Sequence, residues 1–231
     1  MRRKMGTITA VLLIAVGIYI ILVPMIAQKQ TDDVQKKLDL EYEKIVKKNR
    51  QSEKIEEPEP QQQIDDPVVD FTEEDTKESK ENKETNEEVT AILERQQILG
   101  KITCEKIGIE YVVVEGAERD NIRASIGHIL GTAQMGGEGN CVLAGHRGGY
   151  YGEFFKNIHL LQNKDKVVVT DVYDRAYVYE VYDKFVVEPT EIWVCNKIEG
   201  ENTLTLLSCK DEGTRRLIVR CRLTESETQS E

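Results

Sequence analysis

The sequence lacks the features that define several protein classes. Its five cysteines are an odd number and none stands in a CxxC pair, so neither a disulfide framework nor a zinc site fits them well. Residues 96–231 lack a basic stripe, since they carry 21 acids against 16 bases. That balance argues against nucleic acid as the main partner. No internal repeat is visible along the chain.

One long apolar run is present near the N-terminus. Residues 7–27, TITAVLLIAVGIYIILVPMIA, contain no charge over 21 positions, and about 20 apolar residues suffice to cross a bilayer core as a helix. A cleaved signal peptide is the alternative. Its apolar region is usually shorter, roughly 7–15 residues, and MIAQ is a poor small-x-small cleavage site. The sequence therefore favours an uncleaved transmembrane anchor.

The charges before this run predict its orientation. Arg2, Arg3 and Lys4 precede it without any acid, and the positive-inside rule leaves such a flank in the cytoplasm. We therefore expect a single-pass protein of the cell membrane. Residues 1–6 would form a cytoplasmic tail, and everything after Ala27 would lie outside.

Two different segments follow the expected anchor. Residues 28–52 predict a helix next to the membrane, with a short apolar face that could associate with a second copy. Residues 53–90 predict a disordered acidic linker, because 53–88 hold 15 acids, four lysines and three prolines and too little apolar surface to repay the entropy of ordering. A spacer is favoured over an acidic recognition segment. In the helix expected over 28–52, the apolar residues follow one another at steps of four, four, three and one, which fits one helix face. They are Val34, Leu38, Tyr42, Ile45 and Val46.

Residues 91–224 predict one β-rich domain, entered through a short helix at AILERQQILGKI and followed by a polar tail over 225–231. Helical spacing inside the domain is limited to 119–126 and 152–161. Without alternation of strands and helices, the series predicts an antiparallel or mixed barrel or sandwich. The strand-favouring residues Val, Ile, Tyr and Thr gather in short runs at 101–109, 111–115, 140–145, 166–171, 176–187, 192–194, 203–208 and 216–223.

Three histidines are candidate general bases. His146, in NCVLAGHRGGYYGEFF, follows an apolar strand and opens a glycine-rich turn, a place where rigid scaffolds often mount catalytic groups. A histidine that only serves the turn is the plain alternative. His128 and His159 lie within apolar segments, which favours core or half-buried positions for both.

Cys209 is the candidate nucleophile. It closes the strand TLTLLS, and Arg215 and Arg216 stand at the start of the next strand-like run, after a short loop. A cysteine attacks as the thiolate and needs a proton acceptor or a cation nearby, and acyl transfer needs a donor for the developing oxyanion. His146 and one arginine could supply these groups, although composition alone does not bring them together. The other four cysteines lie in or beside strands and are expected to be small buried hydrophobes.

The stretch TLTLLSC, with RLIV after it, resembles the signature of the sortases, the cysteine transpeptidases of Gram-positive cell surfaces. Their strand carries T-L-x-T-C, and an arginine opens the strand that follows. This resemblance covers residues 100–223 and implies a mainly β fold: a closed eight-stranded sortase-type barrel with short helices, preceded by the N-terminal anchor and the acidic stalk. Further stretches resemble successive sortase segments in the right order: GKITCEKIGIEYVVVEGA, GHILGTAQMGGEGNCVLAGHR, FFKNIHLLQNKDKVVV and YVYEVYDKFVVEPTEIWV.

The resemblance also implies roles for single residues. Cys209 matches the nucleophile, and His146 matches the histidine of the AGHR turn. Arg216 is preferred to Arg215 because the family's arginine usually stands three residues before a valine. The sequence departs from the family at Ser208, where threonine is preferred; serine keeps the hydroxyl and loses a methyl group.

The activity implied by the resemblance is sorting at the cell surface. Cys209 would attack the threonine carbonyl of an LPxTG-like motif in a surface protein, and an amine of peptidoglycan or of a pilin lysine would resolve the thioacyl enzyme. No metal or organic cofactor is needed for this chemistry. Acids in 105–120 and 211–213 could form a calcium site of the kind some sortases carry, but without ligand spacing a solvated surface is preferred.

The strand before Cys209 carries the expected substrate-binding residues. Thr205 and Leu207 share a face with Cys209 because side chains alternate along a strand. They are expected to line the floor of the substrate groove, and Ser208 is the third residue of this set.

The spacing of the candidate site residues narrows the choice among sortase subclasses. His146 and Cys209 are 63 positions apart, which leaves no room for the long helical insertion of class B sortases. DPVVDF at 66–71 is the only fragment that resembles a class C lid, and its place in the acidic segment favours a spacer. A class D-like sortase is therefore favoured, with class A close behind.

Two other functions stay open as alternatives. One is an L,D-transpeptidase-like cysteine acyltransferase, although the glycine of its S-x-G-C-x-R type motif is missing beside Cys209. The other is a non-catalytic, anchored, sortase-like binding domain.

Overall fold

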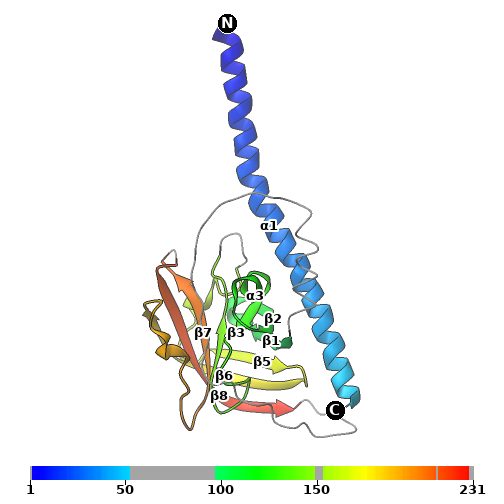
Figure 1. Ribbon diagram of the computed structural model, residues 1–231, viewed down its shortest axis with the longest axis vertical. Coiled ribbons are helices and arrows are strands. Elements are labelled where there is room, and N and C mark those ends of the chain that lie inside the picture. The colour runs from blue at the N-terminus through cyan, green and yellow to red at the C-terminus, as the bar shows by residue number, and fades with distance from the viewer. Residues whose placement is uncertain (1, 53–96, 149–152, 212, 229–231) are drawn as a thin grey trace.

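The structure is a computed structural model, and it describes residues 2–52, 97–148, 153–211 and 213–228 (Figure 1). The expected acidic linker over 53–90, with its DPVVDF fragment, lies outside the described residues. So does the beginning of the helix expected at AILERQQILGKI. The end of that stretch, from Ile98 onward, belongs to a strand, so a helix there is wrong.

Within the described residues, eight strands close into a barrel in the order β1-β2-β3-β4-β7-β8-β6-β5. The β2–β3 and β4–β7 pairs are parallel and the others antiparallel, so the barrel is mixed. This arrangement confirms the closed, mainly β barrel. The strands are β1 (Ile98–Cys104), β2 (Ile109–Glu115), β3 (Ile126–His128), β4 (Gly139–Ala144), β5 (Lys166–Asp171), β6 (Arg175–Val187), β7 (Asn202–Lys210) and β8 (Arg215–Thr228).

Short helical segments interrupt the barrel. The expected strand 101–109 breaks at the 3-10 turn η1 (Glu105–Ile107), because Gly108 takes a left-handed conformation with φ 67° and reverses the chain into β2. Another 3-10 turn, η3 (Ile192–Cys195), replaces the strand expected at 192–194. The helix expected at 119–126 is α3 (Arg119–Ala124), after which the unforeseen strand β3 begins. In the described part of 152–161, turns and the 3-10 segment η2 (Ile158–Leu160) stand in place of a regular helix.

The last strand is longer than expected. β8 continues to Thr228, which pairs with Arg175 of β6. The polar tail expected from 225 is therefore wrong for 225–228. Polar residues can form a strand at 225–228 because this end of the β6–β8 ladder is exposed to solvent.

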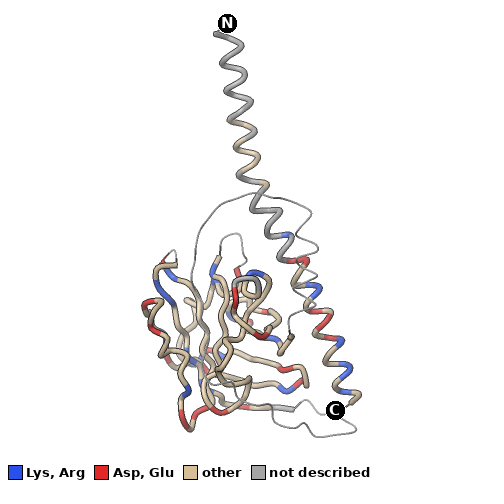
Figure 2. The backbone as a smooth tube through the Cα atoms, in the orientation of Figure 1, with Lys and Arg blue, Asp and Glu red and all other residues tan. Residues whose placement is uncertain are grey.

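Alternating residues of the strands fill the barrel interior. Ile102 of β1, Val169 of β5, Leu206 of β7 and Val219 of β8 are each fully buried in one cluster. Phe155 closes the same cluster from the segment after β4. Figure 2 shows Lys and Arg interspersed with Asp and Glu over the described barrel, without a basic stripe.

One helix, α1 (Arg2–Ser52), covers both the expected anchor and the expected helix over 28–52. Its apolar face is confirmed at Val34, Leu38, Tyr42 and Val46, which are buried. That face packs on the barrel of its own chain, against residues of β1, β2 and α3. Counting the described residues alone, no helix combines the length and the apolarity needed to cross a membrane, so the anchor over 7–27 stays a prediction.

Candidate active site

Three neighbouring strands, β4, β7 and β8, bring the expected site residues to one end of the barrel. Cys209 of β7 pairs with Arg216 of β8 across the antiparallel ladder. β4 runs parallel to β7 with Ala144 opposite Leu207, and the backbone N of Gly145 donates to the Leu207 carbonyl over 3.1 Å. His146 follows Ala144 by two residues, just as Cys209 follows Leu207, so the chain after β4 continues toward Cys209.

Cys209 and Arg216 also belong to one face of the sheet, and His146 follows the neighbouring strand β4 by two residues. Ala144, Leu207 and Ile218 pack together in a cluster separate from the barrel interior, so their side chains point outward. Side chains of a strand return to the same face every second residue. The residues two positions along from these three are His146, Cys209 and Arg216.

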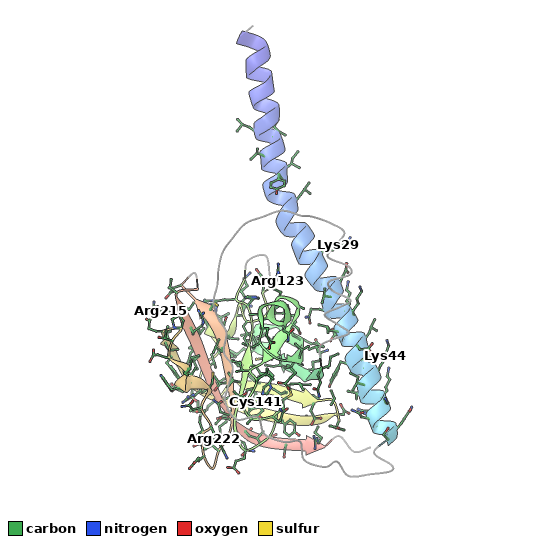
Figure 3. The ribbon with its side chains drawn as sticks, viewed as in Figure 1. Lys29, Lys44, Arg123, Cys141, Arg215 and Arg222 are labelled. Carbon is green, nitrogen blue, oxygen red and sulfur yellow. The ribbon has the colours of Figure 1, made fainter. Side chains whose placement is uncertain are left out.

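The two arginines of the loop end differ in position. Arg216 is buried, and its Nη1 donates to the carbonyls of Gly213 at 2.6 Å and Arg215 at 3.2 Å. Those bonds hold the guanidinium against the loop that joins the two strands. Arg215 stands opposite Lys210, is about half exposed, and forms an ion pair with Asp211 at the tip of the hairpin (Figure 3). The structure therefore brings Arg216, and not Arg215, opposite Cys209.

Cys209 differs from the other cysteines in exposure. It is half-buried, whereas Cys104, Cys141, Cys195 and Cys221 are buried, as expected for structural cysteines. Burial raises the pKa of the Cys195 thiol to about 11, and it raises the pKa of Cys104 and Cys221 as well. These three thiols therefore stay protonated at neutral pH. Exposure makes Cys209 the thiol that a substrate can reach.

The segment around His146 is fixed by its neighbours. The backbone N of Phe155 donates to the His146 carbonyl over 2.8 Å, and the Phe155 ring is fully buried in the barrel core. A Cβ at Gly145 would lie 2.9 Å from that ring, so glycine is required for this close approach. The chain is thereby held on both sides of a half-buried His146.

The other two histidines are placed elsewhere. His128 is buried, with Nδ1 at 2.9 Å from Glu115 Oε1 and Nε2 at 3.0 Å from the Ala133 carbonyl. Burial lowers the pKa of His128, but hydrogen bonds with Cys141 and Glu115 outweigh it and raise the pKa to about 10. His128 is thus a satisfied core residue, as expected. His159 is exposed, so its expected core or half-buried position is wrong: the turn at 158–160 turns this side chain outward.

The three expected substrate-binding residues are all buried. Thr205 and Leu207 share the outer face with Cys209, but the Thr205 hydroxyl donates to Asn140 Oδ1 over 2.7 Å and Leu207 is covered by the outer cluster. Ser208 lies opposite Leu217 and faces the barrel interior. Thr205 is therefore bound to Asn140 and Ser208 faces the core, and contact of any of the three with a substrate stays a prediction.

Asn140 is a positioning residue that the sequence patterns did not reveal. Its Nδ2 donates to the carbonyls of Val194 at 2.9 Å and Asn196 at 3.2 Å, and its Oδ1 accepts from Thr203 and Thr205. One buried amide thus ties the β6–β7 loop to the outer face of β7. No local signal identified it, because its partners lie 54 to 65 positions away.

The same loop brings Trp193 to the outer face, beside Phe185 of β6. Trp193 stacks on Phe185 with ring centroids 5.7 Å apart, and the Arg220 guanidinium lies over both rings. Arg220 pairs with Thr205, four pairs along the ladder from Cys209 and Arg216. Trp193 remains 45 % exposed and Ile192 57 %, so this loop carries apolar surface beside the row of His146, Cys209 and Arg216.

A reachable thiol between a histidine and a guanidinium is the arrangement of a cysteine acyltransferase, because it joins a nucleophile, a proton carrier and an oxyanion donor. The family model described as Sortase domain matches residues 102–224, which is 123 of 231 residues and spans the barrel. The chain belongs to the sortase family of cysteine transpeptidases.

Individual relatives agree with this assignment. Sortase A of Bacillus anthracis is 25 % identical over 225 residues, which is 94 % of each chain. Sortase A of Streptococcus agalactiae is 26 % identical over 134 residues, covering 56 % of this chain and 54 % of that protein. The structure of a Clostridium perfringens Sortase D5 transpeptidase is 35 % identical with a TM-score of 0.52, over 61 % of this chain and 89 % of that one.

Proposed function

We propose that this sortase is a membrane-anchored enzyme that cleaves an LPxTG-like sorting motif and joins the substrate protein to an amine at the cell surface. The observation that carries the proposal is the row of His146, which follows β4 by two residues, with Cys209 of β7 and Arg216 of β8. The likeness to a Sortase D5 transpeptidase supports a class D-like enzyme. Class A stays close behind, because of the full-length similarity to a Sortase A.

The first half of the proposed reaction forms a thioester. The Cys209 thiolate attacks the carbonyl carbon of the threonine in the motif, and the electron pair of the C=O bond moves to oxygen. Arg216 donates hydrogen bonds to that oxyanion. When the C–N bond breaks, His146 gives its proton to the leaving amine, and the substrate protein remains attached to the sulfur.

The second half returns the enzyme to its starting state. His146 takes a proton from the attacking amine, whose nitrogen then forms the new amide bond as the thioester C–S bond breaks. The acceptor is a peptidoglycan stem peptide or a pilin lysine. Each step moves only protons and an acyl group, so the proposed chemistry needs no cofactor.

The proposed location rests on the N-terminal sequence. The uncharged run 7–27 lies within α1, and three basic residues precede it. An anchor there would leave the N-terminus in the cytoplasm and the barrel outside, on the side where surface proteins and the cell wall are found.

The test uses the full-length protein in detergent with a library of LPxTG-type peptides and a soluble amine, read by mass spectrometry. Wild type should release the C-terminal fragment and form the new amide. Cys209→Ala should lose both activities by at least about 1000-fold, because no covalent intermediate can form.

Cys104→Ala serves as the matched control, since Cys104 is buried in the core. It should retain activity. Transfer by Cys209→Ala at the wild-type rate would disprove the nucleophile. A wild type without cleavage or transfer would favour the non-catalytic binding domain. Membership of the sortase family counts against the L,D-transpeptidase alternative.

A further inference from the structure

The contacts between α1 and the barrel extend along much of the barrel's length. Gln35 Nε2 donates to the carbonyl of Ala124, at the end of α3. Further along the helix, Tyr42 Oη donates to the Asp171 carbonyl over 3.3 Å, and Asn49 Nδ2 donates to the Val172 carbonyl over 2.9 Å. Arg50 forms an ion pair with Asp174. From Gln35 to Arg50 the helix rises about 22 Å.

These contacts reveal which end of the barrel each part of α1 touches. Ala124 lies just before β3, where Gly127 pairs with Ala144, two positions before His146. The first contact of α1 is therefore near the active-site end.

The last contacts of α1 lie at the other end. The turn holding Asp171 and Asp174 precedes Arg175, which pairs with Thr228, whereas the far end of β6, Val187, pairs with Arg216. The N-terminal part of α1 thus leaves the barrel at the end that carries Cys209. Figure 1 agrees: the long free part of α1 extends beyond the same end of the barrel as the tip of the β7–β8 hairpin, where Figure 3 labels Arg215.

The docked face fixes the angle between helix and barrel. Val34, Leu38, Tyr42 and Val46 recur every four residues and are buried against β1, β2 and α3. On the same helix Leu40 points away and is 59 % exposed. Apolar burial on one continuous face, with polar contacts from Gln35 to Arg50, opposes both rotation and tilting of the helix. α1 therefore acts as a rigid strut.

We infer that the strut formed by α1 holds the active-site end of the barrel toward the membrane surface, so that the enzyme acts on substrates and acceptors held in that same membrane. The inference rests on the proposed anchor over 7–27. Gln35 is only eight positions beyond Ala27, a rise of about 12 Å along the helix. The barrel thus begins close to the bilayer, with Cys209 on the near side.

The test places one dye at each end of the barrel in full-length protein reconstituted in phosphatidylcholine–phosphatidylglycerol vesicles that carry an acceptor dye on a headgroup. Cys209 takes a maleimide dye selectively, because the other four cysteines are buried. The second position is Arg222→Cys in a Cys209→Ser background. Arg222 pairs with Thr203, six residues along β7 from Cys209, or about 20 Å. Energy transfer to the headgroups should be several-fold faster from position 209 than from 222.

A matched pair of variants tests the strut itself. Leu38→Asp should undock α1 and reduce the ratio of the two transfer rates to about one. Leu40→Asp makes the same chemical change on the exposed face and should keep the ratio. As a milder second variant, Arg50→Asp should lower the ratio partway, and Asp174→Arg added to it should restore the ratio through the exchanged ion pair.

The outcomes separate this inference from the proposed function. Equal transfer from both positions with α1 unaltered, while the unlabelled wild type cleaves the peptide, would overturn the orientation and leave the enzyme assignment standing. Failure to float with vesicles would overturn both the anchor and the orientation. Unequal transfer without peptide cleavage would support the orientation and count against the proposed activity. If Leu38→Asp kept the ratio while cleaving soluble peptide normally, the strut would be disproved.

Discussion

Two outer faces of the barrel are covered by segments from outside it. On β1 and β2, Ile98 and Val112 lie under α1. On β4, β7 and β8, Val142 and Ile218 lie under Val194 and the rest of the β6–β7 loop. The first cover is the long helix α1. It leaves few apolar residues exposed at the contact, so this face of the barrel is fully covered.

The second cover is a short loop that stops before the end of the strands. Cys209 remains half-buried beyond it, while Trp193 and Ile192 stay exposed beside it. Both faces are therefore covered by a packed segment, but the two covers have different consequences. The complete cover is the one that we infer to position the barrel, and the incomplete one leaves Cys209, the proposed nucleophile, half-buried.

The largest expected effect lies on the incompletely covered face. Arg216→Lys should lower kcat for peptide transfer by about 100-fold or more, because lysine keeps the charge but loses the planar fork of donors. Arg215→Lys, at the exposed hairpin tip, should stay within a few-fold of wild type. Steady-state kinetics with a soluble sorting peptide measure both. A larger loss for the Arg215 variant would transfer the role to that residue.

The second prediction removes the link between the loop and the strand. Asn140→Leu should reduce the free energy of unfolding by about 2–4 kcal/mol, because the buried hydroxyl of Thr205 and the carbonyl of Val194 lose their partner. Asn196→Leu, an exposed position in the same loop, should change it by less than about 0.5 kcal/mol. Urea unfolding of the full-length protein in detergent compares the two. Equal stabilities would show that the amide does not hold the loop.

A third prediction concerns the helix-covered face. Leu38→Ala should weaken docking by about 2–3 kcal/mol, since Leu38 is fully buried, whereas Leu40→Ala should have little effect. Amide hydrogen exchange across 34–50 and β2 should speed up in the first variant alone. Unchanged protection in Leu38→Ala would mean that the helix is held by its polar contacts.

The smallest predicted effect on stability concerns His128 and Glu115, which lie between the two covered faces of the barrel. Because the pKa of His128 is raised to about 10 from an ordinary value of 6.5, its contribution to stability is complete below about pH 6.5 and is lost as pH rises through about 10. Glu115→Gln should remove one cause of that shift and flatten the dependence by about 1–2 kcal/mol. Thermal unfolding across this pH range would show it. An equally steep loss in the variant would point to Cys141 as the dominant partner of His128.

The sequence predicted more of the two strands that carry the candidate site residues, β7 and β8, than of the segments that cover the barrel faces. TLTLLSC and RLIV show both strands, the loop between them and the two candidate residues, because these signals are local. The choice of Arg216 over Arg215 followed from the spacing to Val219 and agrees with the strand register. The sequence did not predict the role of Asn140 or the 3-10 turn at 192–195. For the turn, a short apolar run such as IWV fits a strand as well as a turn that packs on a sheet.

By itself, the sequence determined the β-rich domain, the apolar face of the helix over 28–52, and the candidate nucleophile Cys209 with its loop. Periodicity and strand-end motifs act over a few residues and need no distant partner. Only the tertiary structure decided that β4 runs parallel to β7, which brings His146 beside Cys209 across 63 positions. It also decided that the helix packs on its own barrel, because an apolar face specifies that something covers it and leaves open what does.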